Sequence, residues 1–589
     1  MRPHPPLRTV AALALLGCLF VGALSLAGRA RLDRADFAFN NGSEVATLDP
    51  AHSLGILEGR VIRCLYEGLV IKHPKTLEPI PGMARSWEQS PDGLRLTFHL
   101  REDAVWTNGD RVTAHDFVFS FERFLHPETA ANYSHLLWYV RGARAFSTSV
   151  TAAGEAQHSF ADSVGIRALD DFTLIIELER RAPFFLDLMA FYSPCPVNRR
   201  AIEEAKLRWG ESWEVHWLAP EHIVTNGPFR LVDRRVNDRI RLAKFEDYWD
   251  ADNVAFRTVD ILAIEQESTL LNTYLTGSVD YIDRISTNVA DEMMAREDFV
   301  PELYAGTYFY RVNVTQPPFD DLRVRRALSL TIPRERICQD IMKTGQVPAY
   351  GLVPPGIPDY LGPGARGLNA SQQNQVEAKR LLAEAGYGPG GKPMPHIEIH
   401  YNTSEAHAAI AQVVALAWQN QLGLRAKLRN EEWKVYLDTQ NNRRYDVSRS
   451  SWIADYVDPS TFIEQFVSDG DNNRTGWSNP DYDRLVAAAS QELDLPERLR
   501  LLSQAEAVLI DELPILPVYH YVSQNAVAPR LGGFHGNYLD DHFIKHWYWM
   551  DDEELAIRRA NQDPGLQLVD PHGPAEGLYP PSHPKYRPL

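Results

Sequence analysis

Alternation of apolar and polar residues predicts two half-buried strands in the first third of the chain, at residues 94–100 and 172–178. Between them, Thr113 is the predicted N-cap of a helix, with Asp116 at the third helical position in a variant of the capping box. Apolar residues at helical spacing form the stripe that this helix buries: Phe117, Phe121 and Phe124. The two residue periods, two for a strand and about 3.6 for a helix, separate these elements.

Later segments continue to alternate between strands and helices. The predicted elements are a hairpin at 229–236 and 240–244, a helix from Asp320 or Asp321 to Leu330, a helix at about 404–422 and a strand at 426–428. Gly423 is the expected stop of the longer helix, because glycine readily adopts the left-handed conformation that ends helices. Strand–helix–strand alternation on this scale is typical of α/β domains.

Length, composition and charge describe a multidomain globular protein. At 589 residues the chain exceeds one compact core, so two or three domains are expected. Apolar residues make up 44% and charged residues 23%, which is ordinary globular composition. The net charge of −18 argues against nucleic acid or anionic lipid as the main partner. It is compatible with a soluble carrier of small molecules.

Residues that carry common enzyme and metal chemistries show no recognisable pattern. The cysteines are Cys18, Cys64, Cys195 and Cys338. They lack zinc or CxxC spacing, and at most one disulfide is available to the folded body. Nucleotide-binding, P-loop, serine-hydrolase, zinc-protease and EF-hand motifs are missing from the sequence. His396 with His400, and His542 with His546, have helical metal spacing, but solvated or packed histidines are the simpler interpretation. No cofactor, metal or catalytic set is therefore expected.

The amino terminus is a targeting segment whose processing the sequence leaves open. Twenty uncharged residues, 9–28, lie between arginines on both sides. A cleavable signal has an apolar region of about 7–15 residues and a membrane span needs about 20, so length favours a retained anchor. Residues 15–18 also resemble a lipoprotein box that would leave Cys18 acylated, and a cleaved signal is the third alternative. All three export the body of the protein.

One stretch, DVSRSSWIAD from Asp446 to Asp455, combines opposite charges with an aromatic residue. It places a guanidinium at Arg449 and a carboxylate at Asp455, with Trp452 between them. In an extended strand the two charges lie roughly 20 Å apart along the chain, which is of the order of a short peptide's length. A zwitterionic peptide needs both charges, but on spacing alone a strand end with surface charges is the more ordinary interpretation.

Short characteristic blocks follow one another in a fixed order from Phe37 to Trp549. They include Leu48-Asp-Pro50, Tyr66-Glu-Gly-Leu69, Trp106-Thr-Asn-Gly109, Thr225-Asn-Gly-Pro-Phe229, Pro317-Pro-Phe-Asp-Asp-Leu-Arg-Val324, Tyr401-Asn-Thr-Ser404, Glu432-Trp-Lys434 and the stretch 446–455. In this order the chain resembles the solute-binding proteins of bacterial peptide ABC importers, solute-binding protein family 5, and among them the oligopeptide-binding members. Many blocks over about five hundred residues make this likeness specific.

The resemblance implies an α/β fold of the type II periplasmic-binding-protein kind, with two lobes that close on the ligand and an extra domain, three in all. The implied divisions are 1–36 as signal or membrane anchor, 37–67, 196–305 and 523–549 as domain I, 68–195 as domain II, and 306–522 as domain III, the second lobe. Residues 550–589 are acidic, then proline-rich, and are expected to be a disordered tail.

The resemblance also implies roles for single residues. Asp455 takes the α-ammonium group of a peptide, and Arg449 and His407 serve peptide carboxylates, chosen by ligand length. Aromatic residues would line side-chain pockets or the cleft: Trp433, Trp452, Tyr133 and Tyr521. Backbone near Ile56, Ser451 and Ile453 would pair with the peptide main chain as an added strand.

The chain departs from the family pattern at four positions. Gln316 stands where a lysine serves some peptide carboxylates, and Gln440 stands where the family has an arginine, so a different preference for peptide length is expected. The two positions of a family disulfide match Gly306 and Ile453, so that bridge cannot form.

The implied function is capture of peptides of about two to five residues and delivery to an inner-membrane permease with its ATPase subunits. The protein is expected to be a periplasmic monomer that binds no nucleic acid, tethered to the membrane by residues 9–28 or by lipidated Cys18. A carrier of dipeptides, muropeptides or a non-peptide solute is the alternative within the family. An extracytoplasmic hydrolase would need an activated nucleophile or a metal. An anchored sensor has only the long anchor in its support.

Overall fold

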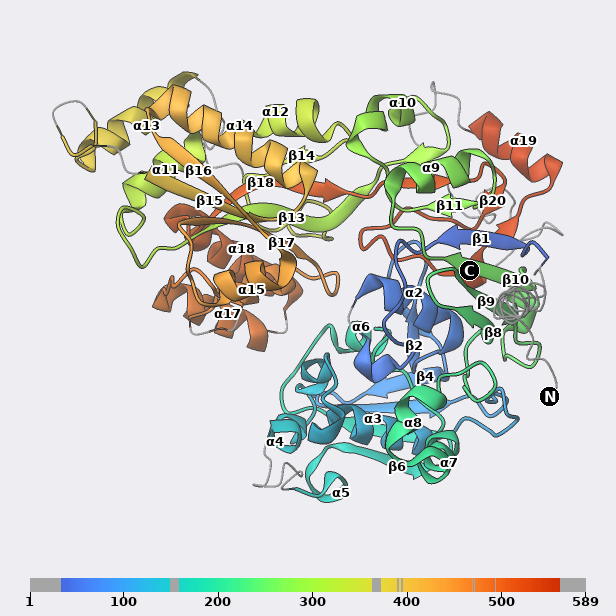
Figure 1. Ribbon diagram of the computed structural model, residues 1–589. Coiled ribbons are helices and arrows are strands. Elements are labelled where there is room, and N and C mark those ends of the chain that lie inside the picture. Colours follow the sequence, from blue (N-terminus) through green and yellow to red (C-terminus); the bar gives the residue numbers. More distant parts are fainter. Residues whose placement is uncertain are drawn as a thin grey trace, which may run out of the picture. The chain divides into compact units, whose positions relative to one another are not determined.

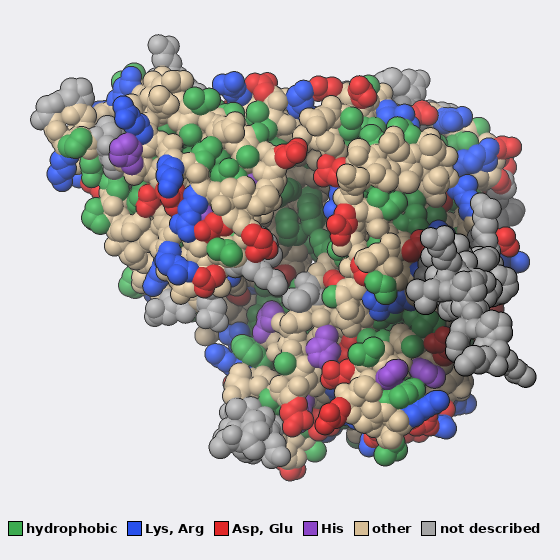
Figure 2. All heavy atoms as spheres, viewed as in Figure 1, with side chains coloured by type: hydrophobic (Ala, Val, Ile, Leu, Met, Phe, Trp, Pro, Cys, Tyr) green, Lys and Arg blue, Asp and Glu red, His purple; other side chains and the backbone are tan. Residues whose placement is uncertain are grey.

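The structure is a computed structural model that describes residues 33–53, 55–148, 158–362, 372–388, 391–393, 396–468, 470, 472–492 and 494–561. From Phe37 onward, three sheets of four or more strands carry the described part of the chain, with helices against their faces (Figure 1). Basic and acidic side chains are interspersed over the face shown in Figure 2. The surplus of acidic residues therefore forms no single negative patch on that face.

The first sheet has seven strands drawn from three separate stretches of the chain. Their order is β12 (Phe299–Val300), β19 (Asn525–Val527), β11 (Tyr281–Ile282), β1 (Phe37–Asn40), β10 (Thr258–Leu262), β9 (Arg239–Lys244) and β8 (Phe229–Arg235). Every residue of β1 is buried, as expected of a central strand that pairs in parallel with β10 and β11. The antiparallel pair β8–β9 confirms the hairpin predicted from the sequence.

The second sheet is antiparallel and has four strands. Their order is β4 (Ala84–Gln89), β5 (Arg95–Leu100), β7 (Thr173–Glu177) and β6 (Ile166–Asp170), and a separate ribbon joins β2 (Val70–Lys72) to β3 (Pro79–Pro81). Strands β5 and β7 confirm the two alternating strands predicted from the sequence. Helix α3 (Ala114–Leu125) has the predicted capping box of Thr113 and Asp116, and its three phenylalanines at helical spacing are buried.

The third sheet has six strands and a different set of helices on each face. Their order is β14 (Val347–Pro348), β18 (Ile515–Val522), β13 (Leu303–Val312), β17 (Val447–Ile453), β15 (His396–Asn402) and β16 (Arg425–Glu431). One face packs on α11 (Leu322–Leu330), α13 (Gln372–Glu384) and α14 (Glu405–Leu422). The other packs on α16 (Ser460–Ile463), α17 (Pro480–Gln491) and α18 (Leu495–Glu512). Successive residues of β13 and β17 therefore enter two different cores.

Caps set the ends of the helices in this region where the sequence predicts them. Asp321 is the N-cap of α11, and its side chain accepts a hydrogen bond from the Arg323 N–H. Ser404 caps α14 in the same way, and Gly423 ends it with a φ of +74°, in the left-handed region.

The prediction that residues 550–589 form a disordered tail is wrong for the first of these residues. Helix α19 (Asp552–Asn561) follows β21 (Tyr548–Trp549) directly, and residues 562–589 lie outside the described part. Asp551 and Glu554 exchange hydrogen bonds with each other's backbone N–H in a capping arrangement. Leu555 packs on Tyr548 and Met550. The acidic first turn stabilises the start of this helix, and burial of Leu555 packs the helix against the preceding strand.

The cysteines and the expected site of a lost disulfide contribute packing rather than bridges. Cys64, Cys195 and Cys338 are buried free thiols. Gly306 and Ile453 are cross-strand partners on β13 and β17. A β-carbon at Gly306 would lie 2.4 Å from Ile453 Cδ1, so the isoleucine side chain fills the space beside the glycine.

In the described part of the chain no helix is long and apolar enough to cross a bilayer. The segment 9–28 and Cys18, on which the anchor and lipoprotein alternatives depend, lie outside that part.

Replacing Asp49 with asparagine is expected to lower the free energy of unfolding by about 3–5 kcal/mol, because it leaves a buried guanidinium unpaired. Both terminal nitrogens of Arg123 donate hydrogen bonds to the buried Asp49 carboxylate, at 3.0 and 2.5 Å. Burial alone would raise the pKa of Asp49, but Arg123 and then His52 lower it to about 2. The stabilisation is therefore full above about pH 4 and is lost as pH falls towards 2.

Urea unfolding of Asp49→Asn at neutral pH measures this loss. Glu204→Gln is the matched control, because Glu204 and Arg200 form an exposed pair and such pairs contribute under about 1 kcal/mol. Equal small losses in both variants would contradict the role of the buried pair.

Candidate functional site

Arg449 is a buried guanidinium without a carboxylate partner in the described chain. It lies on β17 and is 8% exposed. Its terminal nitrogens donate to Asn402 Oδ1 at 3.3 Å and to the Tyr521 hydroxyl at 3.1 Å, and its Cζ lies 4.9 Å from the ring centroid of Tyr308. Its Nε has no acceptor. A buried cation is costly unless an anion pairs with it, so the group is suited to an external carboxylate.

Polar groups beside Arg449 are also left without partners. His407, on the first turns of α14, has a buried Nδ1 with no hydrogen bond, and its ring centroid lies 5.6 Å from that of Tyr308. The hydroxyls of Tyr308 and Tyr310 are buried without partners too. Burial, and then the charge of Arg449, lower the pKa of His407 to about 3. Near pH 7 this histidine is neutral and can donate one hydrogen bond to an anion held by Arg449.

Asp455, just beyond the other end of β17, is a partly buried carboxylate with no cation within 4 Å in the described chain. Its nearest polar partner is the Thr461 hydroxyl, 3.5 Å from Oδ2. Burial raises the pKa of Asp455 to about 6, while Thr461 and the charge of Lys72 oppose that rise. The carboxylate would be stabilised by any ammonium group that reached it.

Between these two charges, one edge of β17 is open. Strand β13 pairs with β17 from Val447 to Ile453, whereas β15 pairs with its other edge only at Val447 and Ser448. The Ala454 N–H donates to the Ala305 carbonyl in the same register, so the peptide groups of alternate residues 450 and 452 face β13. Those of Ser451 and Ile453 then face the opposite edge, where the described chain supplies no strand.

Next to these groups on the open edge, the carbonyl of Arg449 is already occupied. It accepts hydrogen bonds from the Tyr436 hydroxyl and from Gln440 Nε2, the latter at 2.7 Å. Both donors belong to α15 (Trp433–Asn441), which therefore supports the end of the open edge. An added strand on this edge would meet Ser451 and Ile453 but not the Arg449 carbonyl.

The predicted aromatic residues are brought together only in part. Trp452 donates from Nε1 to the Thr461 hydroxyl at 3.3 Å, which is the group that contacts Asp455. Tyr521 contacts Arg449, as described above. Burial, and then the charge of Asp455 among others, raise the pKa of Tyr133, whose ring packs on Phe191 at 5.1 Å.

Two predicted site residues are not joined to the others. Ile56, the first residue of α2 (Ile56–Leu65), is 49% exposed. The side chain of Trp433 lies outside what the structure describes.

The two glutamines that replace family cations form hydrogen bonds around β17. Gln440 is buried and also donates to Ser448 Oγ at 2.8 Å. Gln316 donates to Asp446 Oδ1 at 2.9 Å, just before the strand begins. Neither amide adds a charge near Arg449.

Several residues of this region are not predicted from the sequence. Tyr308 and Tyr436 gave no signal, because only the strand register and the packing of α15 bring them to Arg449. Asn402 lies inside the Tyr401–Ser404 block that carried the resemblance, and that block was the available signal.

In each of the two histidine pairs, one member is buried and hydrogen-bonded to side chains. His400 lies on β15 between Ser448 Oγ, at 2.9 Å, and Glu431 Oε2, at 2.8 Å. His542 contacts Asp540 at 2.9 Å.

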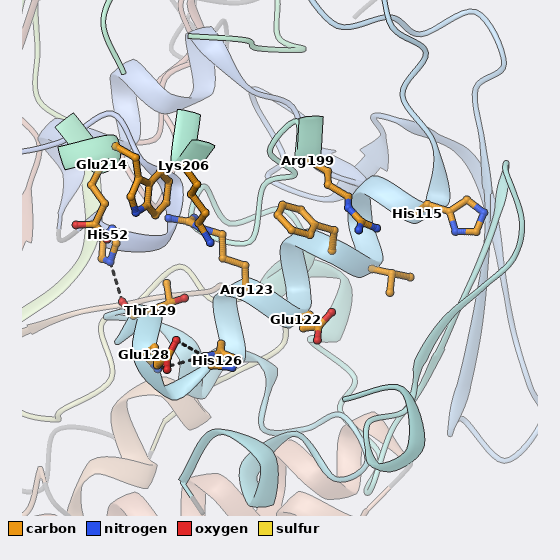
Figure 3. A pocket seen from close by; sticks show the side chains of 13 residues that line it. His52, His115, Glu122, Arg123, His126, Glu128, Thr129, Arg199, Lys206 and Glu214 are labelled. Atoms are coloured by element: carbon orange, nitrogen blue, oxygen red, sulfur yellow. Dashed lines mark hydrogen bonds and ion pairs between the residues drawn. The ribbon is translucent and has the colours of Figure 1, made fainter. Parts of the chain in front are cut away.

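A cavity of about 610 Å³ lies away from these residues, beside α3 (Figure 3). Its lining includes His52, Arg123, Lys206 and Trp213, and none of the predicted site residues. The His52 ring is held by the Thr129 carbonyl at 2.7 Å and by Asp49 at 3.0 Å. The polar groups at this end of the cavity are thus already paired, in contrast to those along β17.

Comparison with known proteins identifies relatives over most of the chain. A sequence profile of bacterial extracellular solute-binding proteins, family 5 Middle, matches residues 78–474. The chain is 36% identical over 533 residues to the periplasmic oligopeptide-binding protein OppA of Salmonella typhimurium, covering 89% of this chain and 94% of that protein. It is 35% identical over 503 residues to the periplasmic murein peptide-binding protein MppA of Escherichia coli, covering 85% and 90%.

Solved structures agree with the sequence matches. The murein tripeptide-binding protein MppA of Escherichia coli superposes with a TM-score of 0.74 at 33% identity, covering 88% of this chain and 99% of that one. OppA of Haemophilus influenzae in complex with the peptide RPPGFSPFR gives 0.71 at 31% identity, covering 88% and 100%.

Proposed function

Because this chain belongs to family 5 of the bacterial extracellular solute-binding proteins, we propose that it captures short peptides by their main chain and both termini. The observation that carries this proposal is a pair of opposite charges, at the two ends of an open strand edge, for which the described residues supply hydrogen bonds but no ion-pair partner. A peptide laid antiparallel to β17 would place its ammonium group at Asp455 and its carboxylate at Arg449 and His407. The separation of the charges suits about two to five residues.

The fold class predicted from the sequence is confirmed by the solved neighbours: an α/β fold of the type II periplasmic-binding-protein kind, with two lobes and an extra domain. We assign residues 37–67, 196–305 and 523–549 to domain I, 68–195 to domain II and 306–522 to domain III. The assignment is supported by the strands of the three sheets, which fall in these ranges apart from the first residues of β13.

Three of the predicted aromatic residues are proposed to line the cleft, each on a separate observation. Tyr521 accepts a hydrogen bond from Arg449, Trp452 donates to the Thr461 hydroxyl beside Asp455, and, after burial, the charge of Asp455 contributes to the raised pKa of Tyr133. Ser451 and Ile453 are proposed to bond the peptide main chain. The backbone near Ile56 is proposed to bond the peptide main chain and Trp433 to line the cleft, and both proposals rest on the family resemblance alone.

The family is one of solute-binding proteins rather than enzymes. We propose a location outside the cytoplasm, since the relatives are periplasmic, with a membrane tether through residues 9–28 or lipidated Cys18. Delivery to a permease with its ATPase subunits, and a monomeric state, are further parts of the proposal.

A second candidate is a carrier of dipeptides, of murein peptides or of a non-peptide solute. The similarity to a murein peptide-binding protein supports the murein version. Asp455, which has no cation partner among the described residues, disfavours any solute without an amine, because a partly buried carboxylate needs a cation.

Calorimetry with blocked peptides tests the proposed function. The full chain in mild detergent is titrated with trialanine, N-acetyl-trialanine and trialanine amide. We expect acetylation to weaken binding by about two to four orders of magnitude, because it removes the ammonium that pairs with Asp455. Amidation should also weaken binding, through Arg449.

Equal affinity for free and acetylated peptides would contradict the proposed role of the ammonium site. Mass spectrometry of ligands that co-purify with the protein identifies the natural length.

A further inference from the structure

One face of the four-stranded sheet carries three arginines around a single glutamate. Glu177 on β7 lies opposite Arg95 on β5, and Arg167 reaches it from β6, the strand on the other side of β7. Arg141 comes from the segment before α4 (Ala143–Thr148), and its backbone N–H donates to the Glu177 carbonyl at 2.9 Å. Paired strands and a backbone hydrogen bond therefore fix the positions of all four residues.

Each of these arginines gives one terminal nitrogen to the Glu177 carboxylate. Arg141 Nη2 donates to Oε2 at 2.9 Å, and the Nη2 atoms of Arg95 and Arg167 donate to Oε1 at 3.3 and 3.4 Å. The arginine side chains are 50–56% exposed, whereas that of Glu177 is 23% exposed. Because a guanidinium has several N–H donors, these bonds use only some of them. The exposed remainder can meet a group that arrives from solvent.

The cluster keeps a surplus of positive charge. All ion pairs of the three arginines in the described chain go to Glu177. The arginines lower the pKa of Glu177, first through the hydrogen bond from Arg141, so this carboxylate is ionised at neutral pH and cancels one of the three charges. The adjoining segment 149–157, outside the described residues, contains one acidic residue, Glu155, which can cancel at most one more. A positive charge therefore remains, in a chain whose net charge is −18.

Two interpretations of the cluster compete: a network that supports the sheet and a site for an anion. Exposed ion pairs add little to stability, so support of the fold is a weak reason for a third arginine at one carboxylate. Like charges held together repel one another, and an added anion relieves that repulsion. A guanidinium matches the oxygens of carboxylate and phosphate groups and is more weakly hydrated than an ammonium. A phosphate group presents more oxygens than a carboxylate, so it can bridge guanidiniums on neighbouring strands.

We propose that Arg95, Arg141 and Arg167 form a binding site for a phosphate group, carried either by a soluble phosphate or phosphate ester or by a phospholipid headgroup. The site goes beyond the proposed function and does not rest on it. Its residues belong to domain II, and the hydrogen bonds of Arg449 and Asp455 include none of them. A protein tethered as proposed would meet headgroups at high local concentration, which is the argument for the lipid source.

Calorimetry of the full chain in a nonionic detergent and a phosphate-free buffer tests the site. Inorganic phosphate, glycerol phosphate and glycerophosphoglycerol, the deacylated headgroup of phosphatidylglycerol, are titrated at neutral pH and physiological ionic strength. We expect saturable binding that the triple variant Arg95→Gln/Arg141→Gln/Arg167→Gln weakens at least about tenfold, because it removes three charge-assisted donors. The melting temperature of this variant and its affinity for trialanine should stay close to those of the unmodified protein, which shows that it folds.

Glu177→Gln should change the affinity in the opposite direction. Without the carboxylate the three guanidiniums are uncompensated, so phosphate should bind at least about threefold more tightly, and a gain cannot come from misfolding. Arg380→Gln is the matched control, because Arg380 on α13 is 53% exposed and pairs with both Glu377 and Glu384, whose charges outnumber its own. This control should leave every affinity unchanged.

The three probes distinguish the source of the phosphate group. Tighter binding of glycerophosphoglycerol than of inorganic phosphate and glycerol phosphate assigns the site to a lipid headgroup, and the reverse order assigns it to a soluble phosphate. Failure of all three probes to bind, equal affinities in the unmodified protein and the triple variant, or no tighter binding in Glu177→Gln would overturn the site. Failure of the unmodified protein to bind trialanine would contradict the peptide function alone, and the phosphate titrations would still decide the anion site.

Discussion

Asp455→Asn is expected to weaken the binding of trialanine by about two to four orders of magnitude. The variant leaves the peptide ammonium desolvated and without its anion, which typically costs about 3–5 kcal/mol. The amide retains the shape of the side chain and its contact with Thr461, so that the loss reports the charge. Calorimetry of the variant and the unmodified protein measures the ratio, and a change below about threefold would exclude Asp455 as the ammonium site.

Stability and pH provide controls for this variant. Burial raises the pKa of Asp455 to about 6, so the ionised carboxylate destabilises the folded, ligand-free protein above the unfolded pKa of about 4. Asp455→Asn should therefore be at least as stable near pH 7, with a gain on the order of 1 kcal/mol. A loss of binding with retained stability cannot come from unfolding.

The same titration gives a pH profile for the unmodified protein. Below about pH 6 the ligand-free carboxyl binds a proton that the ammonium must displace, so affinity should fall by up to about tenfold per pH unit. Above about pH 8 the peptide amine loses its charge and affinity should fall again. In Asp455→Asn the acid limb should disappear while the weak residual binding persists.

Arg449→Met is expected to weaken binding by about two orders of magnitude or more for the peptide length whose carboxylate reaches the guanidinium. A desolvated carboxylate that loses its hydrogen-bonded partner typically costs about 2–5 kcal/mol. Other lengths should lose much less, since their carboxylates end elsewhere along β17. Calorimetry with alanine peptides of two to five residues measures the dependence on length.

Arg429→Met is the matched control, because Arg429 lies on β16 and is paired with Glu398 and Glu431. It should leave the affinity for every length unchanged. Equal losses for all lengths in Arg449→Met would contradict a role in carboxylate recognition. They would point instead to a general effect on the strand.

The sequence predicts a strand or helix correctly where the spacing of its apolar residues is regular and, for a helix, where a capping residue marks one of its ends. The alternating strands β5 and β7, the capped helix α3 and the helix α14 with its glycine stop all have this property. The tail shows the limit: composition predicted disorder from residue 550, but α19 forms because Leu555 finds a small apolar cluster. That cluster is a tertiary contact, which composition does not report.

The family, the alternating α/β elements and the position of the charge pair Arg449 and Asp455 can all be predicted from the sequence. Those conclusions depend on residue identity and spacing. That these charges lie at the ends of an open strand edge, without an ion-pair partner among the described residues, follows from the tertiary structure alone, because burial and pairing depend on which strands lie beside β17.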